Sequence, residues 1–308
     1  MDSLPDTQTQ QTIKELTEKF IAATKVTASS FKDGELFTIA EPEAFKKINS
    51  GFLAETLKVM TYNAANFQDH PRWDERCKAI AAEIDKHSPD LIGIQELRYT
   101  TSLILRVNMI NNLLSKLRTP YYVLFKSAMN HGNFFTASLE GLTILSKHPI
   151  VWHTWQDLPD AKKDLNKRIK LTARILPKNA KGEEIPIDFT VTHFTYDLTS
   201  QERQAEKMRE LLDSEPTKNQ TIVGDFNTET QSPMWHLTKK QGSRPDFTDC
   251  HLKPTWPAWN PEYNLDKIFY RGDLKHIEDK MIIQSKCESK ETMDSDHLYV
   301  IAEFCFDG

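Results

Sequence analysis

Residues 221–227 have the sequence TIVGDFN, a short apolar run that ends in a glycine, an aspartate and an asparagine. Apolar runs of this length, bounded by turn residues, are typical of buried strands. Gly224 permits a tight bend. Because side chains alternate along a strand, Asp225 and Asn227 are expected on one face and Phe226 in the core. The segment therefore predicts a buried strand that carries two polar groups to a sheet edge.

Three other segments, far apart in the chain, also place acidic or amide side chains at the end of an apolar run or beside one. They are residues 60–63 (MTYN), 92–96 (IGIQE) and 295–297 (SDH). Each polar residue could instead cap a helix or start a turn, as most such residues do. Four such segments in order favour convergence at one edge of a sheet.

Carboxylate and amide oxygens gathered beside a histidine are donors that a Mg²⁺-type ion prefers, together with water. Such ions usually act on phosphate groups. We therefore expect a metal-assisted site for phosphate chemistry at this edge of the sheet.

The chain has 308 residues, of which 39% are hydrophobic, and this suffices for one large α/β core or two modest ones. We favour one catalytic domain. The formal net charge is −5 and the sequence pI is about 6.1, so the overall field repels a polyanion unless a local basic patch overrides it. Nonspecific wrapping of duplex DNA is disfavoured. A small phosphorylated substrate, or a nucleic acid held only near the site, is compatible with this charge.

The four cysteines are scattered and lack the CxxC or Cys/His spacing of zinc sites, so we interpret them as buried thiols. Residues 1–11 are acidic and polar where a secretory signal has basic residues and an apolar core, and no run approaches membrane-spanning length. These features predict a cytoplasmic or otherwise intracellular protein without an integral membrane segment, although leaderless export leaves no such mark.

The pattern changes near residue 56. Residues 1–55 are expected to form an N-terminal extension, with an amphipathic helix over 12–24 that docks on the main domain. A partner-binding or membrane-surface helix is the alternative. From 56 to 308, strands and helices alternate, which predicts the catalytic domain.

Within this domain, hydrophobic periodicity and breakers define the expected elements. The predicted strands are 57–62, 91–95, 121–125, 141–146, 169–176, 185–193, 221–226, 265–270, 281–286 and 297–306, and the predicted helices are 72–87, 102–117 and 201–212. Residues 130–133 (NHGN) are interpreted as a turn, although Asn130 and His131 could meet a substrate.

The order of the motifs TYN, IQE, THF, GDFN, LDKIF and SDH between Leu57 and Phe306 resembles that of the endonuclease/exonuclease/phosphatase superfamily. This superfamily comprises magnesium-dependent phosphoesterases, which include deoxyribonuclease, abasic-site endonuclease, neutral sphingomyelinase and inositol polyphosphate phosphatase. The resemblance implies an α/β fold of the deoxyribonuclease type, a four-layered αββα sandwich of two mainly antiparallel sheets. It also implies a Mg²⁺ cofactor, for which Mn²⁺ can substitute.

The resemblance assigns metal ligation to Glu96, with Asn63 beside it and Asp296 as a further ligand. A carboxylate that closes an apolar strand, as Glu96 does, is costly to bury unless a cation pairs with it. The preceding Gln95 is interpreted as a structural hydrogen bonder.

The remaining motif residues resemble groups that act on the phosphate. Asp225 resembles the carboxylate that positions the attacking water, and Asn227 the amide that contacts the phosphate. His297 resembles the histidine that touches the scissile phosphate or the water, and Asp266 the acid that orients it and raises its pKa. His193 resembles the histidine that stabilises the pentacovalent phosphorane or protonates the leaving oxygen. A core histidine with satisfied hydrogen bonds is the alternative for His193.

Arg168 resembles a substrate-facing arginine of many relatives, and a solvated basic face is the alternative. We expect a phosphodiester substrate, with nucleic acid or a nucleotide favoured. Loops, and not the sheet edges, decide the substrate in such a fold. Four tryptophans near predicted strand ends offer surfaces for base stacking, although buried packing is expected for most of them. They are Trp152, Trp155, Trp256 and Trp259.

A phospholipid or inositol phosphate head group, cleaved in the manner of a sphingomyelinase, is the alternative substrate. Residues 141–149 (GLTILSKHP) resemble the corresponding strand of that branch, but no long apolar hairpin for insertion into a bilayer is evident. A non-catalytic binding scaffold is disfavoured because the motifs are intact. No protein partner is identifiable from the sequence.

Overall fold

The computed structural model describes residues 56–66, 72–101, 108–131, 137–179, 181–229, 231–239, 246–251 and 253–306. The extension expected over 1–55, with its amphipathic helix, lies outside these residues and stays a prediction. In the part of the chain that the structure describes, no helix is long and apolar enough to span a membrane.

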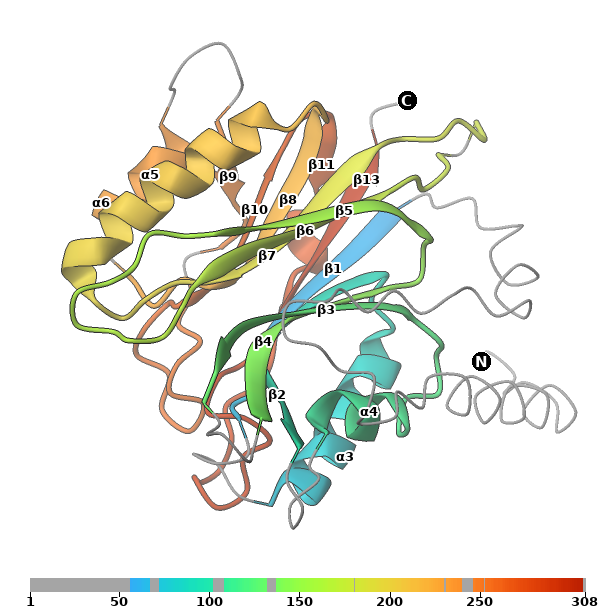
Figure 1. Ribbon diagram of the computed structural model, residues 1–308. Coiled ribbons are helices and arrows are strands. Elements are labelled where there is room, and N and C mark those ends of the chain that lie inside the picture. The colour runs from blue at the N-terminus through green and yellow to red at the C-terminus, as the bar shows by residue number, and fades with distance from the viewer. Residues whose placement is uncertain are drawn as a thin grey trace, which may run out of the picture.

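Two β-sheets form the centre of the molecule (Figure 1). Among the described residues, the strand order of the first sheet is β11 (Leu274–His276), β13 (Val300–Phe306), β1 (Thr56–Asn63), β2 (Leu91–Thr101), β4 (Ala137–Ser146) and β3 (Tyr122–Asn130), with β12 (Ile282–Ile283) paired to β13. The order of the second sheet is β5 (Ile150–Asp157), β6 (Ile169–Ile175), β7 (Ile187–His193), β8 (Asn219–Asp225), β10 (Asp266–Arg271) and β9 (Thr248–Asp249). The pair β1 and β2 and the pair β7 and β8 are parallel, while the other strand pairs described are antiparallel.

Helices cover the outer faces of both sheets (Figure 1). The first sheet carries α3 (Trp73–His87) and α4 (Met109–Leu114), and the second carries α5 (Leu198–Ser214) and α6 (Gln231–Thr238). A 3-10 helix, η2 (Glu278–Lys280), precedes β12. Hydrophobic clusters fill the spaces under α3 and α4, between the two sheets, and under α5 and α6. The predicted αββα sandwich is thereby confirmed.

Burial on both faces explains the apolar runs of the central strands. In β1, Leu57 and Val59 belong to the core between the sheets, whereas Met60 and Tyr62 pack in the core under α3 and α4. A strand that is covered on both sides needs apolar residues at successive positions rather than at alternate ones. Such strands are therefore recognisable from the sequence.

Two glycines allow close packing near the polar ends of these strands. A Cβ atom at Gly93 of β2 would lie 2.4 Å from Val223 Cγ2 on the facing sheet. A Cβ atom at Gly224 of β8 would lie 2.1 Å from the carbonyl oxygen of Thr192 in β7. Both separations are far inside van der Waals contact. Gly224 thus permits the close approach of β7 and β8 directly before Asp225.

We expect Gly224→Ala to lower the free energy of unfolding by about 1–3 kcal/mol, the usual cost of overpacking. The added methyl group meets backbone, which cannot move away by a side-chain rotation. Urea unfolding of the variant and the wild type measures the difference. An unchanged free energy of unfolding would show that β7 and β8 can separate at this position without cost.

Some elements differ from the sequence predictions. Neither β5 nor α6 is among the predicted elements, and the helix expected over 102–117 lies, among the described residues, at Met109–Leu114, where the Asn108 side chain caps its first turn. As an edge strand with mostly exposed or half-buried residues, β5 lacks an apolar run. With only eight residues, α6 is too short for a helical period to be recognised in its sequence. The cysteines are free thiols, buried at Cys77 and partly buried elsewhere.

Candidate active site

The strand register brings three predicted site residues together at one edge of the second sheet. His193 ends β7 and is the register partner of Asp225, the last residue of β8. Asp266 begins β10 and is the partner of Asp225 on its other side. Register partners on adjacent strands have Cβ atoms about 5 Å apart. Sheet pairing alone therefore places these groups side by side.

Asn63 connects this group to the first sheet. Its amide nitrogen donates to Glu96 Oε1 at 3.0 Å and to Asp225 Oδ2 at 3.1 Å. Its amide oxygen accepts the backbone N–H of Ala65. The neighbouring Gln95 is fully buried and donates within the first sheet, which confirms its structural role. The Asn63 amide therefore lies between two carboxylates and bridges the ends of both sheets.

Glu96 has a left-handed backbone, with φ 63°, at a β-bulge between Ile94 and Leu97. A non-glycine residue in this conformation stores strain on the order of 1–3 kcal/mol, and a bulge re-aims the side chain. The carboxylate also accepts from the backbone and side-chain nitrogens of Asn66, at 3.1 and 3.2 Å. Asn66 is not among the predicted site residues. Its place in the amide-rich run NAAN that begins at Asn63 is the signal that could have identified it.

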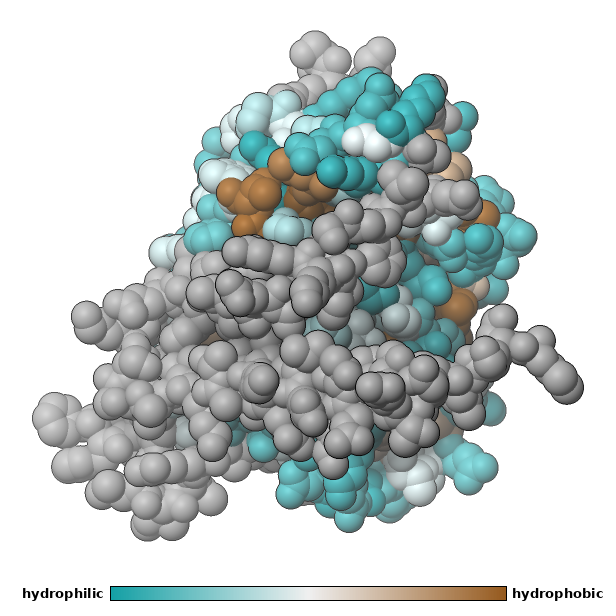
Figure 2. All heavy atoms as spheres, turned by 90° about the vertical axis from the view of Figure 1, so that its right-hand side faces the viewer, coloured by the Kyte–Doolittle hydropathy of each residue, from teal (hydrophilic) through white to brown (hydrophobic). Residues whose placement is uncertain are grey.

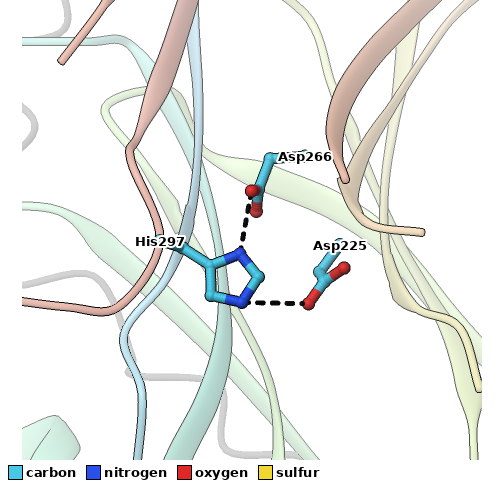
Figure 3. A group of neighbouring side chains, drawn as sticks. All are labelled: Asp225, Asp266 and His297. Atoms are coloured by element: carbon cyan, nitrogen blue, oxygen red, sulfur yellow. Dashed lines mark hydrogen bonds and ion pairs between the residues drawn. The ribbon is translucent and has the colours of Figure 1, made fainter. Parts of the chain in front are cut away.

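His297 lies between two aspartates (Figure 3). Its Nδ1 is 2.9 Å from Asp266 Oδ2, and its Nε2 is 3.6 Å from Asp225 Oδ2. Burial lowers the pKa of His297, but the charges of Asp266 and Asp225 raise it well above its ordinary value. Burial raises the pKa of Asp225 to about 7, against the opposing effect of His297 and with a further rise from Asp266. The imidazole is therefore a cation held between two carboxyl groups.

His193 and Asn227 form a hydrogen-bonded pair. The amide nitrogen of Asn227 donates to the carbonyl oxygen of Phe194 at 3.0 Å and lies 3.1 Å from His193 Nε2. Since the carbonyl oxygen can only accept, this nitrogen is the donor, and His193 Nε2 accepts its second hydrogen. Burial, with the charges of Arg168 and His297, lowers the pKa of His193 well below its ordinary value. His193 is therefore neutral at pH 7, in contrast to His297.

A buried glutamine on α5 holds the loop around Asn227. Gln201 Nε2 donates to the carbonyl oxygens of Thr195, at 2.9 Å, and Asn227, at 2.6 Å. Asn227 has φ 50°, a left-handed conformation that asparagine tolerates better than most residues. Gln201 thus fixes the segments that follow both β7 and β8, a contact that the sequence does not reveal.

Arg168 is buried directly before β6. Its Nη2 donates to Asp164 Oδ2 at 2.8 Å, and the same oxygen accepts from the Thr195 hydroxyl at 2.8 Å. The alternative of a solvated basic face is therefore wrong for this residue. Arg168 instead forms part of the cleft wall that also contains His193.

A cleft of ≈ 390 Å³ opens beside these groups. The predicted site residues that line it are Glu96, Arg168, His193, Asp225, Asn227, Asp296 and His297. Asn63 and Asp266 are fully buried and contact residues of this lining. The unpredicted polar residues of the lining include Asn66, Arg98, Glu140 and Asn166. His131, for which contact with a substrate was the alternative to a plain turn, also lines the cleft. All the predicted site residues thus meet at one cleft.

Arg76 of α3 ties together two segments of this cleft. Its guanidinium donates to the carbonyl oxygens of Ala64 and the following residue, directly after Asn63. Its Nε donates to the carbonyl oxygen of Asp294 at 2.8 Å, two residues before Asp296. The side chain is only 3% exposed. Arg76 therefore positions the chain around two of the predicted metal ligands.

The tryptophans differ from expectation, since none of the four is fully buried. Trp152 and Trp155 of β5 are each 37% exposed and lie against Arg174 and Lys126, respectively. Their register partners on β6 are Arg174 and Leu171, which project from opposite faces of that strand. The two rings therefore do not form one continuous stacking surface. Trp256 does line the cleft, where its indole N–H donates to the Asp296 carboxylate.

One group among the described residues has metal-ligating atoms close together. Asp225, Asp266 and His297 each offer one such atom, and these lie within 4.8 Å of one another. Carboxylate and imidazole donors can hold a divalent cation, although a histidine must be unprotonated to do so. This group differs from the ligand set expected from the sequence, which centres on Glu96.

Residues 60–297 match the family model described as "Endonuclease/Exonuclease/phosphatase family". An endonuclease/exonuclease/phosphatase from Bacteroides vulgatus has a similar structure, with a TM-score of 0.61 at 17% identity over 82% of this chain and 99% of that chain. A mannosyl-6-phosphatase of Bacteroides thetaiotaomicron gives 0.59 at 18%, over 81% and 100%. Truncated TDP2 of Caenorhabditis elegans gives 0.56 at 16%, over 81% and 97%. A comparison with curated protein sequences gave no significant match.

The matched segment begins in β1 and ends at His297, so it contains every predicted site residue. The structural similarities, at less than 25% identity, show a shared fold and do not identify a substrate. The two mixed sheets with outer helices agree with this fold. By the extent of the family match, the chain belongs to the endonuclease/exonuclease/phosphatase family.

Proposed function

We propose that the protein is a Mg²⁺-dependent phosphodiesterase that hydrolyses its substrate by in-line attack of water. The observation that carries the proposal is the convergence of a charged histidine, two aspartates and an amide network at one cleft. Hydrolysis of a phosphoester needs a group that handles a proton and groups that stabilise developing negative charge. The family, whose members are generally metal-dependent phosphoester hydrolases, supports the same reaction class.

The donors at the cleft fit a hard divalent cation. Glu96 and Asp296 line it, Asn63 contacts Glu96, and one oxygen of Asp266 is buried without a hydrogen-bond partner among the described residues. Because His297 is charged, we assign Mg²⁺ or Mn²⁺ to the carboxylates of Glu96 and Asp296. The Asn63 amide turns its nitrogen toward Glu96, so we assign Asn63 to orienting that carboxylate. When bound, the ion supplies a Lewis acid that offsets charge on the phosphate.

The other residues are assigned from their charge states. Asp225, with a pKa of about 7, aligns the attacking water and accepts its proton. His297, which Asp266 keeps charged, stabilises the negative charge that develops on the phosphate. His193 is neutral and accepts at Nε2, so its proton is on Nδ1, and we assign this N–H to hydrogen bonding at the phosphorane rather than to protonation of the leaving group. Asn227, whose amide nitrogen donates to Phe194 and His193, is assigned to holding the imidazole in place. Arg168 completes the phosphate-binding wall.

A nucleotide or nucleic-acid phosphodiester is the proposed substrate. The cleft volume of ≈ 390 Å³ lies within the range of small-molecule sites. Trp256 and Tyr196 line it and offer rings on which a base can stack. The net charge of −5 opposes extended contact with a polyanion. A single nucleotide, or the end of a strand, satisfies these conditions.

A phospholipid or inositol phosphate head group is the second candidate, and one observation favours it. Leu165, Tyr196 and Leu198 are 95%, 56% and 63% exposed, and Tyr196 lines the cleft. Exposed apolar side chains next to a site can enter a lipid interface. On the face in Figure 2, the coloured part of the surface is mainly hydrophilic with small hydrophobic patches. An intracellular location stays a prediction.

The purified protein is expected to hydrolyse bis(p-nitrophenyl) phosphate in Mg²⁺ or Mn²⁺ and to lose this activity in EDTA. Without the cation, the carboxylates of the site repel the negatively charged phosphate. Single-stranded DNA, duplex DNA, RNA, sphingomyelin and an inositol polyphosphate complete the panel. Cleavage of the lipid alone would overturn the first choice of substrate. Activity that resists the chelator would overturn metal dependence.

Arg76→Lys is expected to weaken Mn²⁺ binding about tenfold and to lower kcat at saturating metal. Lysine keeps the positive charge but lacks the planar guanidinium, whose several N–H groups bond to the Ala65 and Asp294 carbonyl oxygens at once. Calorimetric Mn²⁺ titration measures the affinity, and Lys78→Arg, at an exposed position of the same helix, is the control. If Arg76→Lys has the wild-type Mn²⁺ affinity and kcat, the Arg76 guanidinium is not needed to position the two chain segments.

A further inference from the structure

Three polar residues, Arg98, His131 and Glu140, form a cluster on the wall of the cleft. Arg98 of β2 and Glu140 of β4 are register partners, and His131 directly follows β3. All three line the cleft. Arg98 lies two residues beyond Glu96, about 7 Å along a strand. The cluster is therefore adjacent to the proposed position of the scissile phosphate.

The charges of this cluster are balanced. Glu140 Oε2 accepts from Arg98 Nε at 2.9 Å and also from Arg98 Nη2, and it lies 3.6 Å from His131 Nε2. Burial raises the pKa of Glu140, but His131 and the Arg98 charge bring it below its ordinary value, so the carboxylate is ionised. The side chains of Arg98 and Glu140 are 5% and 8% exposed. The buried pair has no net charge to offer a ligand.

Arg168, the other arginine of the cleft, is balanced in the same way. It pairs at 2.8 Å with Asp164, whose side chain is fully buried. The remaining residues of the lining that carry charge are Glu96, Asp225, Asp296 and His297. His297 and a divalent cation offset negative charge where the scissile phosphate binds. The described lining therefore has no uncompensated arginine or lysine for a second phosphate.

We propose that Arg98, His131 and Glu140 form a subsite for the sugar ring attached to the scissile phosphate, and that the cleft selects nucleotide-like diesters with a single phosphate. Guanidinium, imidazole and carboxylate groups hydrogen bond to hydroxyl groups without requiring charge on the ligand. A second phosphate next to the first would bring negative charge against Glu140, and like-charge contact opposes binding. The inference rests on the proposed phosphodiesterase function.

Three chromogenic diesters with a common p-nitrophenolate leaving group test this subsite. Bis(p-nitrophenyl) phosphate has no sugar, thymidine 5′-(p-nitrophenyl phosphate) adds one, and its 3′-phosphorylated derivative adds a second phosphate. We expect the wild-type kcat/KM for the thymidine ester to exceed that for each of the other two at least about tenfold. Equal or reversed values would overturn the subsite. A lack of any hydrolysis of bis(p-nitrophenyl) phosphate in Mg²⁺ and Mn²⁺ would instead overturn the proposed function.

Two variants make the test specific to the cluster. Glu140→Gln removes the negative charge that faces Arg98 and that would repel a second phosphate. The ratio of kcat/KM for the 3′-phosphorylated ester to that for the thymidine ester should therefore rise at least about tenfold. His131→Ala removes a contact to the sugar, so the ratio for the thymidine ester to bis(p-nitrophenyl) phosphate should fall. The control, Glu303→Gln, opens an ion pair with Lys280 at 2.9 Å outside the cleft lining and should change neither ratio.

Thermal unfolding shows whether Glu140→Gln is folded. If it is not, His131→Ala decides the question, because this side chain is 32% exposed and its loss is tolerable for the fold. If the folded variants keep both wild-type kcat/KM ratios, the proposed subsite is wrong.

Discussion

His297→Ala is expected to lower kcat for bis(p-nitrophenyl) phosphate in saturating Mg²⁺ about 10³-fold while the protein stays folded. The substitution removes a buried cation at the place where we expect negative charge to develop on the phosphate. Asp225 and Asp266 remain, and one of them can take up a proton because burial and like charge raise the pKa of a carboxyl group. Loss of the fold is therefore not expected.

Two measurements separate chemistry from folding in this variant. Thermal unfolding should show a folded protein, and kcat should fall with little change in the metal concentration needed for half-maximal rate. His276→Ala is the matched control, since His276 packs against Tyr270 and Phe304 outside the cleft lining and should keep the wild-type kcat. A wild-type rate in His297→Ala would show that the assignment of roles is wrong.

Glu96→Gln is expected to weaken Mn²⁺ binding at least about 100-fold and to abolish measurable turnover at ordinary metal concentrations. A neutral amide replaces the carboxylate that contacts Asn63 and Asn66. The amide nitrogen of the new glutamine would face the nitrogen donors of Asn63 or Asn66, which bond to a Glu96 oxygen in the wild type. The substitution therefore removes a hydrogen bond as well as a charge. Calorimetric titration and activity as a function of metal measure both effects.

The same titration distinguishes the two candidate metal sites. Glu303→Gln, at an ion-paired glutamate of β13, controls for loss of a carboxylate elsewhere and should bind Mn²⁺ normally. If Glu96→Gln binds Mn²⁺ like the wild type and Asp266→Asn does not, the ion belongs to the group of Asp225, Asp266 and His297 instead. The reverse result supports the assignment centred on Glu96.

The central strands and their polar ends are predictable from local pattern. Segments 57–62, 91–95 and 221–226 have consecutive apolar residues because both of their faces are buried. The edge strand β5 and the helix α6 are not predictable in this way. Most residues of β5 are exposed or half-buried, so the strand has no apolar run. The eight residues of α6 are too few to show a helical period.

The contacts of the site depend on residues that are far apart in the chain. Arg98 and Glu140 are separated by 42 residues, and Asn63 and Asp225 by 162. Periodicity describes neighbours within one strand or helix and contains no information about which distant side chain becomes a partner. For this reason Arg76, Gln201, Arg98 and Glu140 do not appear among the predicted residues.

The sequence by itself determined the fold class, the polar strand ends and the identity of the residues gathered at them, because burial leaves a local apolar pattern and the motif order is specific. Only the tertiary structure decided the charge of each group. His193 and His297 both lie at the polar edge of the sheets, yet their pKa values shift in opposite directions. Asp225 Oδ2 lies near both rings, 3.5 Å from His193 Nε2 and 3.6 Å from His297 Nε2. His297 also contacts Asp266, whereas burial and the charges of Arg168 and His297 act on His193. These environments arise from strand register and sheet packing, which bring distant segments into contact.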